Sequence, residues 1–308
     1  MEKPHDNMTI GIIGAGAMGS LYSSYFYRGG LKTVIYENDP AIVEAMQKGI
    51  TLLTTPPEVL PIPVSGDIGI LSECAAVFLF IKSHATEKAV QDISGSLAED
   101  AIVVSLQNGI GNYEKIREFF PAERIVYGTT SMGATKKDAG SVVPGGAGTV
   151  IIGGHNMAAV RTVYGVLVHC AINVVITDDP ASALWKKAIV NAAINPLGAL
   201  LGVPNGSLVE NDESLKLQEI IVDEAVQAAT AAGISVDKQE MLDLVRDICI
   251  KTGTNICSML QDIRAGRKTE IDSINGEIIK AGRDRGIALP CNETLYLLVR
   301  AMEKERRG

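Results

Sequence analysis

A lysine and two asparagines lie at one-turn spacing in a stretch that otherwise has the composition of an apolar helix. In SALWKKAIVNAAINP, the residues Lys187, Asn191 and Asn195 are four positions apart, so a helix would align them along one narrow stripe. Burying such groups without partners would cost about 1–3 kcal/mol each. The stripe therefore either faces solvent or binds a polar ligand. Because Asn is a poor helix former, two of them at this spacing favour the ligand.

A glycine-rich turn near the N-terminus has the pattern of a phosphate-binding loop. The apolar run Thr9–Ile13 leads into Gly14-Ala15-Gly16-Ala17-Met18-Gly19, and a helical stretch follows. In this context Gly14 permits a tight turn, Gly16 lets the backbone approach a pyrophosphate, and Gly19 lets helix and strand pack closely. The N-terminus of the helix would face the anion. The pattern predicts a dinucleotide site.

An acid at the end of the second predicted strand is placed to bind the ribose of that dinucleotide. Glu37 follows Gly14 at close to the offset of about 20 residues that this role requires. Its carboxylate would accept hydrogen bonds from both ribose hydroxyls and would repel a 2′-phosphate, and no Arg or Lys follows it closely. The alternative is a solvated acid at a strand end. The sequence predicts NADH in preference to NADPH.

Short apolar runs alternate with helical stretches through the first half of the chain. The early runs are continuously apolar, which is typical of strands buried on both faces of a parallel sheet. The predicted strands are Thr9–Ile13, Thr33–Tyr36, Val77–Ile81, Ile102–Leu106, Ile125–Thr129, Thr149–Ile152 and Asn173–Ile176. The glycine-rich stretch 140–154 is expected to form hairpins. We predict an α/β fold in which residues 1–178 form a doubly wound Rossmann domain.

The second half of the chain has no convincing strand, and four helical patterns follow one another there. They are Ser182–Asn195, which is expected to stop at Pro196, then Glu213–Gly233, Lys238–Thr252 and Thr269–Arg285. Residues 179–308 are therefore predicted to form an all-helical domain.

Composition excludes several classes of protein. The chain has 28 basic and 36 acidic residues, a net charge of −8, which argues against a nucleic-acid binder. Its longest apolar-looking stretch without charge, Ala188–Val209, is interrupted by Asn, Pro and Gly, so no membrane span is expected. The N-terminal MEKPHDNM lacks the apolar run of a signal peptide, and the five cysteines show no CxxC spacing. We expect a cytoplasmic protein without a structural metal.

The lysine stripe and six further motifs resemble the ketopantoate reductase (2-dehydropantoate 2-reductase) family. The motifs follow the family order over essentially the whole chain, and Gln107 stands where the family usually has His. They are Gly14–Gly19, Phe80-Ile81-Lys82, Gln107–Gly111, Leu184–Leu197, Pro204-Asn205-Gly206, Asn255–Asp262 and Thr269–Gly276.

This resemblance implies an activity and a role for each matched residue. The family reduces 2-dehydropantoate to (R)-pantoate with a nicotinamide cofactor, on the route to pantothenate and coenzyme A. Its fold is a Rossmann domain followed by a helical domain like that of 6-phosphogluconate dehydrogenase. By motif match Lys187 is the proton donor, since an ammonium group can protonate the alkoxide that hydride transfer leaves. Glu270 is the acid near this lysine and the cofactor.

The remaining matched positions divide into two sets. The substrate-binding positions are Asn108, Lys187, Asn191, Asn195, Asn205, Asn255 and Ser258. The cofactor-binding positions are Gly14, Ala15, Gly16, Ala17, Met18, Gly19, Glu37, Asn38, Lys82, Asn108, Ala134 and Glu270. Members that use NADPH commonly have Arg where Asn38 stands, which agrees with the interpretation of Glu37.

Two other functions fit the same resemblance. One is a paralogous reductase of another branched 2-oxo acid, because the pocket walls decide the substrate. The other is a non-catalytic dinucleotide-sensing protein on the same fold, which the presence of both Lys187 and Glu270 disfavours. A small-molecule 2-oxo acid and a second copy of the chain, in a homodimer, are the expected partners.

Overall fold

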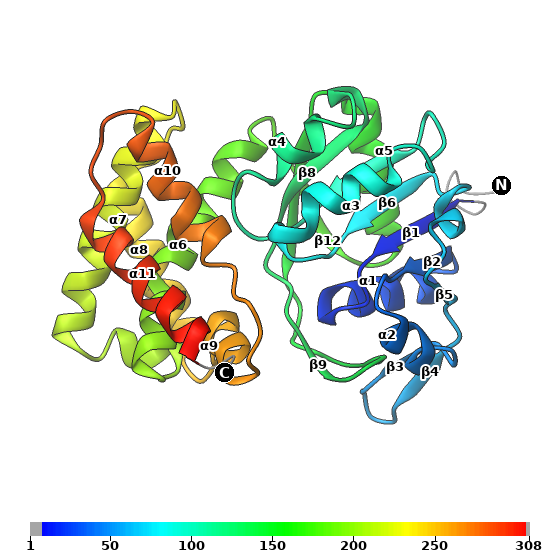
Figure 1. The fold of residues 1–308 in the computed structure, drawn as a ribbon, viewed down its shortest axis with the longest axis horizontal. Helices are drawn as coiled ribbons and strands as arrows, with labels where there is room; N and C mark the ends of the chain where they lie inside the picture. The colour runs from blue at the N-terminus through cyan, green and yellow to red at the C-terminus, as the bar shows by residue number, and fades with distance from the viewer. Residues whose placement is uncertain (1–7, 306–308) are drawn as a thin grey trace. The chain divides into compact units, whose positions relative to one another are not determined.

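The computed structural model describes residues 8–305, and they divide into two compact units. The first unit contains residues 8–107 and 112–180, and the second contains 108–111 and 181–305 (Figure 1). Residues 1–7, which make up most of the segment examined for a signal peptide, lie outside the described residues. The assignment of residues 108–111 to the second unit was not expected from the sequence.

The first unit is built on an eight-stranded sheet with the order β12-β11-β8-β7-β6-β1-β2-β5. Neighbouring strands are parallel except for β11, which runs antiparallel to β8. The strands are β1 (Thr9–Ile13), β2 (Lys32–Tyr36), β5 (Val64–Ser65), β6 (Ala76–Leu79), β7 (Ile102–Ser105), β8 (Ile125–Thr130), β11 (Thr149–Gly154) and β12 (Asn173–Ile176). All seven predicted strands and the Rossmann class are thereby confirmed.

Both faces of this sheet are buried, as its continuous apolar runs predict. In β1, Ile12 belongs to an apolar cluster with Tyr22 of α1 (Ala17–Arg28), whereas its neighbour Ile13 belongs to a cluster with Val90 of α3 (Thr86–Ile93). Helix α5 (Met157–His169) covers the same face as α1, and α4 (Asn112–Arg117) covers the face of α3. Successive side chains of one strand therefore pack under different helices.

A second, smaller sheet was not predicted. Its order is β4-β3-β10-β9, from β4 (Glu58–Leu60), β3 (Ile50–Leu52), β10 (Ser141–Pro144) and β9 (Ala134–Asp138). Within the glycine-rich stretch, β10 returns antiparallel to β9 through Gly140, whose φ of +79° suits glycine. Helix α2 (Pro40–Ala45) follows β2.

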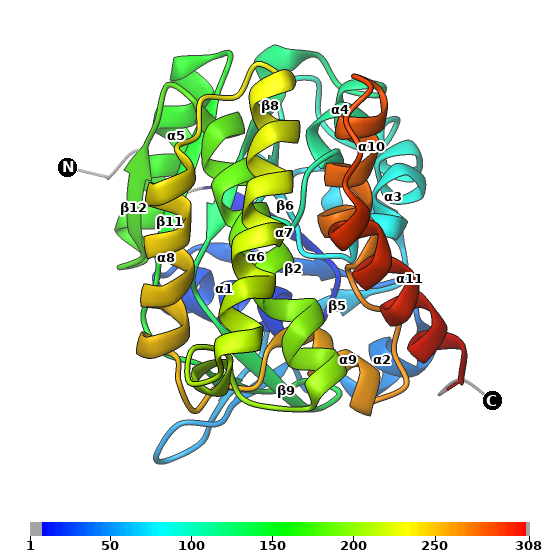
Figure 2. The same cartoon turned by 90° about the vertical axis from the view of Figure 1, so that its left-hand side faces the viewer.

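The second unit has only helices and turns in its described residues. They are α6 (Pro180–Leu201), α7 (Asp212–Ala231), α8 (Lys238–Lys251), α9 (Ser258–Arg264), a π-helical turn (Asp272–Gly276), α10 (Glu277–Arg283) and α11 (Pro290–Glu305). Helix α7 packs against α8, α10 and α11 (Figure 2), and α6 supplies much of the apolar core. Within residues 8–305, no helix has both the length and the apolar composition needed to cross a membrane.

The prediction that the first of these helices stops at Pro196 is wrong. Helix α6 continues through the proline to Leu201, although a proline inside a helix removes a hydrogen bond and costs about 3 kcal/mol. Leu197 and Ala199, which follow the proline, are 3% and 2% exposed, so their burial offsets that cost. The predicted helix Thr269–Arg285 also begins later, as the π-helical turn at Asp272.

Candidate functional site

The turn Gly14–Gly19, called the nucleotide turn below, contains two glycines that the protein's own packing requires. Gly14 has a φ of +96°, and a Cβ placed on it would lie 2.8 Å from a methyl carbon of Ile81. A Cβ on Gly19 would lie 1.9 Å from the carbonyl oxygen of Gly14. These two positions therefore exclude any side chain, which fixes the tight turn between β1 and α1 and the close approach of the helix.

The third glycine of the turn is open, and this openness points to a ligand. A Cβ on Gly16 would meet no protein atom nearer than the Phe80 carbonyl oxygen at 3.9 Å. Gly16 is also the N-cap of α1, and its φ of −73° is accessible to any residue. It provides no side-chain cap, so the first N–H groups of the helix are left for an anion. The turn thus fits the pyrophosphate of a dinucleotide.

Glu37 lies directly beside this turn. Its Oε2 accepts a hydrogen bond from the backbone N–H of Ala15 at 2.8 Å, and its Oε1 accepts one from the N–H of Asp39 at 3.1 Å. Asp39 in turn caps α2, because its carboxylate accepts the N–H of Ala41. Asn38, between the two acids, is exposed. The bond to Ala15, which the sequence did not indicate, places the carboxylate at the nucleotide turn.

The loop that carries Lys82 is held by a buried glutamine. Gln107, at the end of β7, donates through Nε2 to the carbonyl of Ile81 and to the hydroxyl of Thr86, each at 2.8 Å. Its Oε1 accepts from Ser105 at 3.0 Å. Gln107 is 5% exposed, so this residue, which replaces the usual histidine, fixes the backbone next to Lys82.

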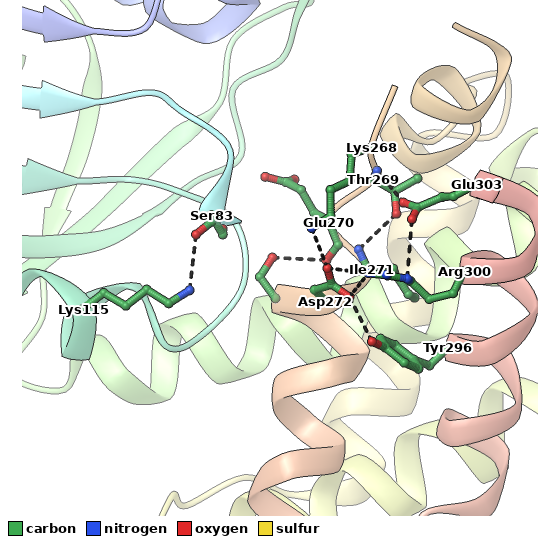
Figure 3. Close-up of polar contacts among 11 residues, drawn as sticks. Ser83, Lys115, Lys268, Thr269, Glu270, Ile271, Asp272, Tyr296, Arg300 and Glu303 are labelled. Atoms are coloured by element: carbon green, nitrogen blue, oxygen red, sulfur yellow. Dashed lines mark hydrogen bonds and ion pairs between the residues drawn. The ribbon is translucent and has the colours of Figure 1, made fainter. Parts of the chain in front are cut away.

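Sequence reasoning missed two further residues that fix the same loop. Asn112 donates to the hydroxyl of Ser83 at 3.1 Å and accepts from Thr86 at 3.2 Å. Lys115 donates to the carbonyl of Ser83 at 3.2 Å (Figure 3). The available signal in the sequence was the position of Asn112 directly after the motif Gln107–Gly111. Ala134 begins β9 and packs against the same apolar cluster as Met18 of the turn.

In the second unit, the polar stripe of α6 is not a solvent-facing surface. Asn195 is 7% exposed, and Lys187 and Asn191 are half-buried. Within residues 8–305, neither the Asn191 nor the Asn195 side chain forms a hydrogen bond with another protein group. The amide atoms of Asn195 are not fully buried, so they stay accessible to a polar ligand. The stripe is therefore partly accessible, and the ligand site stays a prediction from the sequence.

Lys187 and Glu270 act on each other electrostatically. Burial lowers the pKa of Lys187 to about 8, while the negative charge of Glu270 raises it against that effect. Glu270 Oε2 also accepts a hydrogen bond from Nδ2 of Asn108 at 3.0 Å. The three polar side chains come from α6, from the segment before the π-helical turn, and from residues 108–111.

The four-residue segment 108–111 is fixed to the π-helical turn. The N–H of Ile110 donates to the carbonyl of Ser273 at 3.0 Å. A Cβ on Gly109 would lie 2.3 Å from that same carbonyl oxygen, and Gly109 has a φ of +84°. Only glycine fits there, and the close approach holds Asn108 next to Glu270.

The loop after α8 joins the remaining predicted substrate positions to α6. Asn205 donates through Nδ2 to Thr252 at 2.8 Å and through its backbone N–H to the carbonyl of Asn255 at 3.0 Å. Its Oδ1 is buried without a partner among the described residues. Asn255 and Ser258 are exposed, and between them the Cys257 thiol donates to the carbonyl of Asn195 at 3.5 Å.

Comparison with known proteins gives matches over both units. The family profile "Ketopantoate reductase PanE/ApbA" matches residues 10–157, and "Ketopantoate reductase PanE/ApbA C terminal" matches residues 179–303. The 2-dehydropantoate 2-reductase of Halobacterium salinarum is 31% identical over 97% of this chain and 100% of its own length. That of Pyrococcus horikoshii is 35% identical over 96% and 98%.

Solved structures match over nearly the whole length as well. A D-mandelate dehydrogenase in a ternary structure with NADH and anilino(oxo)acetate superposes with a TM-score of 0.93 at 29% identity, covering 98% of this chain and all of the other. A PanE/ApbA family ketopantoate reductase from Ralstonia eutropha gives a TM-score of 0.89 at 27% identity, covering 98% of this chain and all of the other.

Proposed function

Because the chain belongs to the ketopantoate reductase family, we propose that it is an NAD(P)H-dependent 2-dehydropantoate 2-reductase. Its reaction would reduce the C2 ketone of 2-dehydropantoate to the alcohol of (R)-pantoate, a step toward pantothenate and coenzyme A. The observation that carries the proposal is Lys187, which heads a polar stripe on α6 and is electrostatically coupled to Glu270.

The side chains supply the proton for this reduction. A reduced nicotinamide, when bound, would supply the hydride that C2 of the oxo acid receives. The ammonium of Lys187 stabilises the negative charge that develops on the C2 oxygen and then donates a proton to it. A pKa of about 8 keeps Lys187 mostly protonated at pH 7 and still makes it a better acid than an ordinary lysine. Solvent then returns the proton to Lys187.

The asparagines would bind the rest of the substrate. Asn191, Asn195 and Ser258 can donate to the carboxylate of a small oxo acid. Asn108 is bonded to Glu270, and the backbone of Asn255 is bonded to that of Asn205. The buried Oδ1 of Asn205 is an acceptor and needs a donor. A carboxylate and a ketone have no donor, whereas the 4-hydroxyl of 2-dehydropantoate does. Because this acceptor is fully buried, it would meet such a hydroxyl only if the loop around Asn205 moves when the substrate binds.

Of the two nicotinamide cofactors, we propose that the protein prefers NADH to NADPH. Glu37 is fixed at the turn by Ala15, where it would meet the 2′-phosphate of NADPH. Arg28 is the last residue of α1, a 12-residue helix about 18 Å long that starts at the turn, and it pairs with Glu58 at 3.5 Å. Lys32 starts β2, at the opposite end from Glu37. Neither cation is therefore placed to neutralise such a phosphate.

The other proposed cofactor contacts follow from the family resemblance, and Asn108 and Glu270 among them belong to the second unit. They are the backbone of Gly14, Ala15, Gly16, Ala17, Met18, Gly19 and Ala134, and the side chains of Asn38, Lys82, Asn108 and Glu270. Homodimer formation and a cytoplasmic location stay predictions from the sequence, and light scattering of the purified protein would test the first.

A second candidate function is the reduction of a different 2-oxo acid. The solved structure with a TM-score of 0.93 is a D-mandelate dehydrogenase bound to anilino(oxo)acetate, an oxo acid with an aromatic substituent. The same lysine and asparagine stripe could serve that substrate class, with the pocket walls choosing between an aryl and a hydroxyalkyl group.

Steady-state kinetics separate these functions. We expect kcat/KM with NADH to be highest for 2-dehydropantoate, lower by about 10-fold or more for 2-oxo-3-methylbutanoate, which lacks the hydroxyl, and lowest for phenylglyoxylate. A preference for phenylglyoxylate would establish the second candidate. No turnover with any of the three acids and either cofactor would contradict both.

A further inference from the structure

The carboxylate of Asp272, two residues after Glu270, is held by three side chains. Arg300 donates through Nη1 to both oxygens at 2.8 Å, and the hydroxyl of Tyr296 donates to Oδ1 at 3.0 Å. The ammonium of Lys268 lies 2.9 Å from Oδ2. Burial alone would raise the pKa of Asp272, but these bonds and charges outweigh it and hold the pKa below its usual value.

The residue before Glu270 is also held by α11, the helix that carries Tyr296 and Arg300. The backbone N–H of Thr269 donates to Oε1 of Glu303, a carboxylate that is 5% exposed, at 2.7 Å. Arg300 lies next to this carboxylate as well, with 3.7 Å between its Nε and Glu303 Oε2. One guanidinium on α11 therefore bridges the two carboxylates that hold the backbone on either side of Glu270. We call Lys268, Asp272, Tyr296, Arg300 and Glu303 the α11 cluster.

Glu270 is flanked by this cluster but does not belong to it. Figure 3 shows its side chain extending away from Asp272 and Arg300. Its carboxylate instead accepts from Asn108 and acts on Lys187. Other charged residues follow on α10, where Glu277 lies beside Gly111 and 3.9 Å from Lys280.

The backbone after Glu270 forms a π-helical turn. The π-helical turn Asp272–Gly276 closes with a bond from the N–H of Gly276 to the carbonyl of Ile271 at 3.0 Å. Such turns are rare and are found where a structure is fixed for function. The carbonyl of Glu270 also accepts from the N–H and hydroxyl of Ser273, each at 3.1 Å. The chain on both sides of Glu270 is therefore bonded to α11, at the Thr269 backbone and at the Asp272 side chain, and the Glu270 carbonyl is bonded to Ser273.

We propose that Arg300 is a positioning residue: by bridging Asp272 and Glu303, it sets the place of the Glu270 carboxylate with respect to Lys187 and Asn108. The proposal rests on the proposed function, in which Lys187 donates the proton. It assigns a role in the reaction to the C-terminal helix, which contributes no matched substrate or cofactor position.

The pH dependence of kcat/KM tests this proposal. The Glu270 charge raises the pKa of Lys187, and activity requires the protonated amine, so displacing Glu270 should move the loss of activity at high pH to lower pH. We expect Arg300→Met to move this midpoint down by about one pH unit and to lower kcat by about 10- to 100-fold. Tyr296→Phe, which removes one hydroxyl, should give a smaller shift in the same direction. Arg300→Lys should recover part of it.

Arg283→Met is the matched control. It removes an exposed arginine that pairs with the exposed Glu293 at 3.4 Å in the same unit, and we expect a wild-type midpoint. Unfolding temperatures are measured for all variants. If Arg300→Met and Tyr296→Phe lower the unfolding temperature but keep the wild-type midpoint, the cluster is structural and the proposal is wrong. Failure of the proposed function differs from this, because the wild type itself would then reduce no 2-oxo acid.

Discussion

The nucleotide turn in the first unit and the Lys187 stripe in the second are built by different means. At the turn, backbone groups do the binding, and the residues that shape it, Gly14, Gly16 and Gly19, lie within six positions. At the stripe, side chains do the chemistry. Asn108, Lys187 and Glu270 come from three segments far apart in the chain.

This difference determines how each region should respond to mutation. The turn is specified by the absence of side chains, so it is sensitive to added atoms and insensitive to the identity of exposed neighbours. The stripe is specified by functional groups and by the contacts that orient them. Removing one such group should abolish chemistry without unfolding the protein, and the predictions below test this contrast.

The largest effect is expected from Lys187→Ala. Loss of a general acid typically lowers turnover by about 10²–10⁴-fold, and the nucleotide turn is untouched by this change. The measurements are kcat with 2-dehydropantoate and dinucleotide affinity from the fluorescence of the reduced nicotinamide. Nearly full turnover would show that another group donates the proton, and lost dinucleotide affinity would show that the two regions are not separable.

Replacing the acidic charge of Glu37 by a basic charge at position 38 should change which cofactor the enzyme prefers. We expect the wild type to favour NADH by about 10²-fold, from charge repulsion and lost ribose hydrogen bonds. The double variant Glu37→Ala, Asn38→Arg should shift the preference toward NADPH, measured as the ratio of kcat/KM values. Because Glu37 also holds Ala15, NADH binding should weaken too. Glu44→Ala, an exposed acid on α2, is the control. Equal use of both cofactors by the wild type would refute the Glu37 argument.

Asn195→Ala should raise KM for the oxo acid by about 10-fold, because it removes donors to the bound substrate. The fold should stay intact, because the Asn195 side chain forms no hydrogen bond with the rest of the described protein. Its backbone carbonyl, which accepts from Cys257, is retained. An unchanged KM together with a sharply lower Tm would make Asn195 structural.

A pair of alanine substitutions separates ligand contact from packing at the turn. Gly16→Ala adds a methyl group that meets no protein atom within 3.9 Å, so Tm should hardly change while dinucleotide affinity falls by about 10-fold. Gly19→Ala places its Cβ 1.9 Å from the Gly14 carbonyl oxygen and should lower Tm by several degrees, roughly 4–8 °C per kcal/mol in a small domain and less in a larger one. The reverse pattern would remove the case for a ligand at Gly16.

The smallest effect is a pH dependence of the wild type. Lys187 acts as the ammonium, so kcat/KM is full well below its folded-state pKa and falls to half near pH 8. Glu270→Gln removes the charge that raises this pKa and should move the midpoint lower. A midpoint that moves higher, or no fall up to pH 10, would contradict the assignment.

The sequence was most informative where local pattern decides structure. Each of the seven predicted strands is a short apolar run, the central strands β6 and β7 are buried at every position, and the glycine turn follows the first strand. The small sheet was not predicted, because β3 and β4 have three residues each and are too short to show the alternation of a strand. Helix α9, with seven residues, escaped for the same reason, and α11 was also missed.

The sequence was less informative where distant residues meet. The spacing of Lys187, Asn191 and Asn195 indicated a ligand stripe, and family motifs indicated Glu270 and Asn108. No pattern indicated that Glu37 would hold Ala15, that residues 108–111 would join the helical unit, or that α11 would hold Asp272. Such contacts depend on how the chain folds over more than 20 residues, and local propensity carries no information about them.

The placement of residues 108–111 has a consequence for how this protein can be made and divided. The helical unit takes four residues from the middle of the first unit, including Ile110, which is 8% exposed in the helical core. A ribosome delivers those residues long before the helices that surround them, so the second unit is completed only late in synthesis. A fragment starting at residue 181 would lack part of its own interior, and no single cut yields both units whole. The two units therefore cannot be produced as two separate halves of the chain, even though each has its own core.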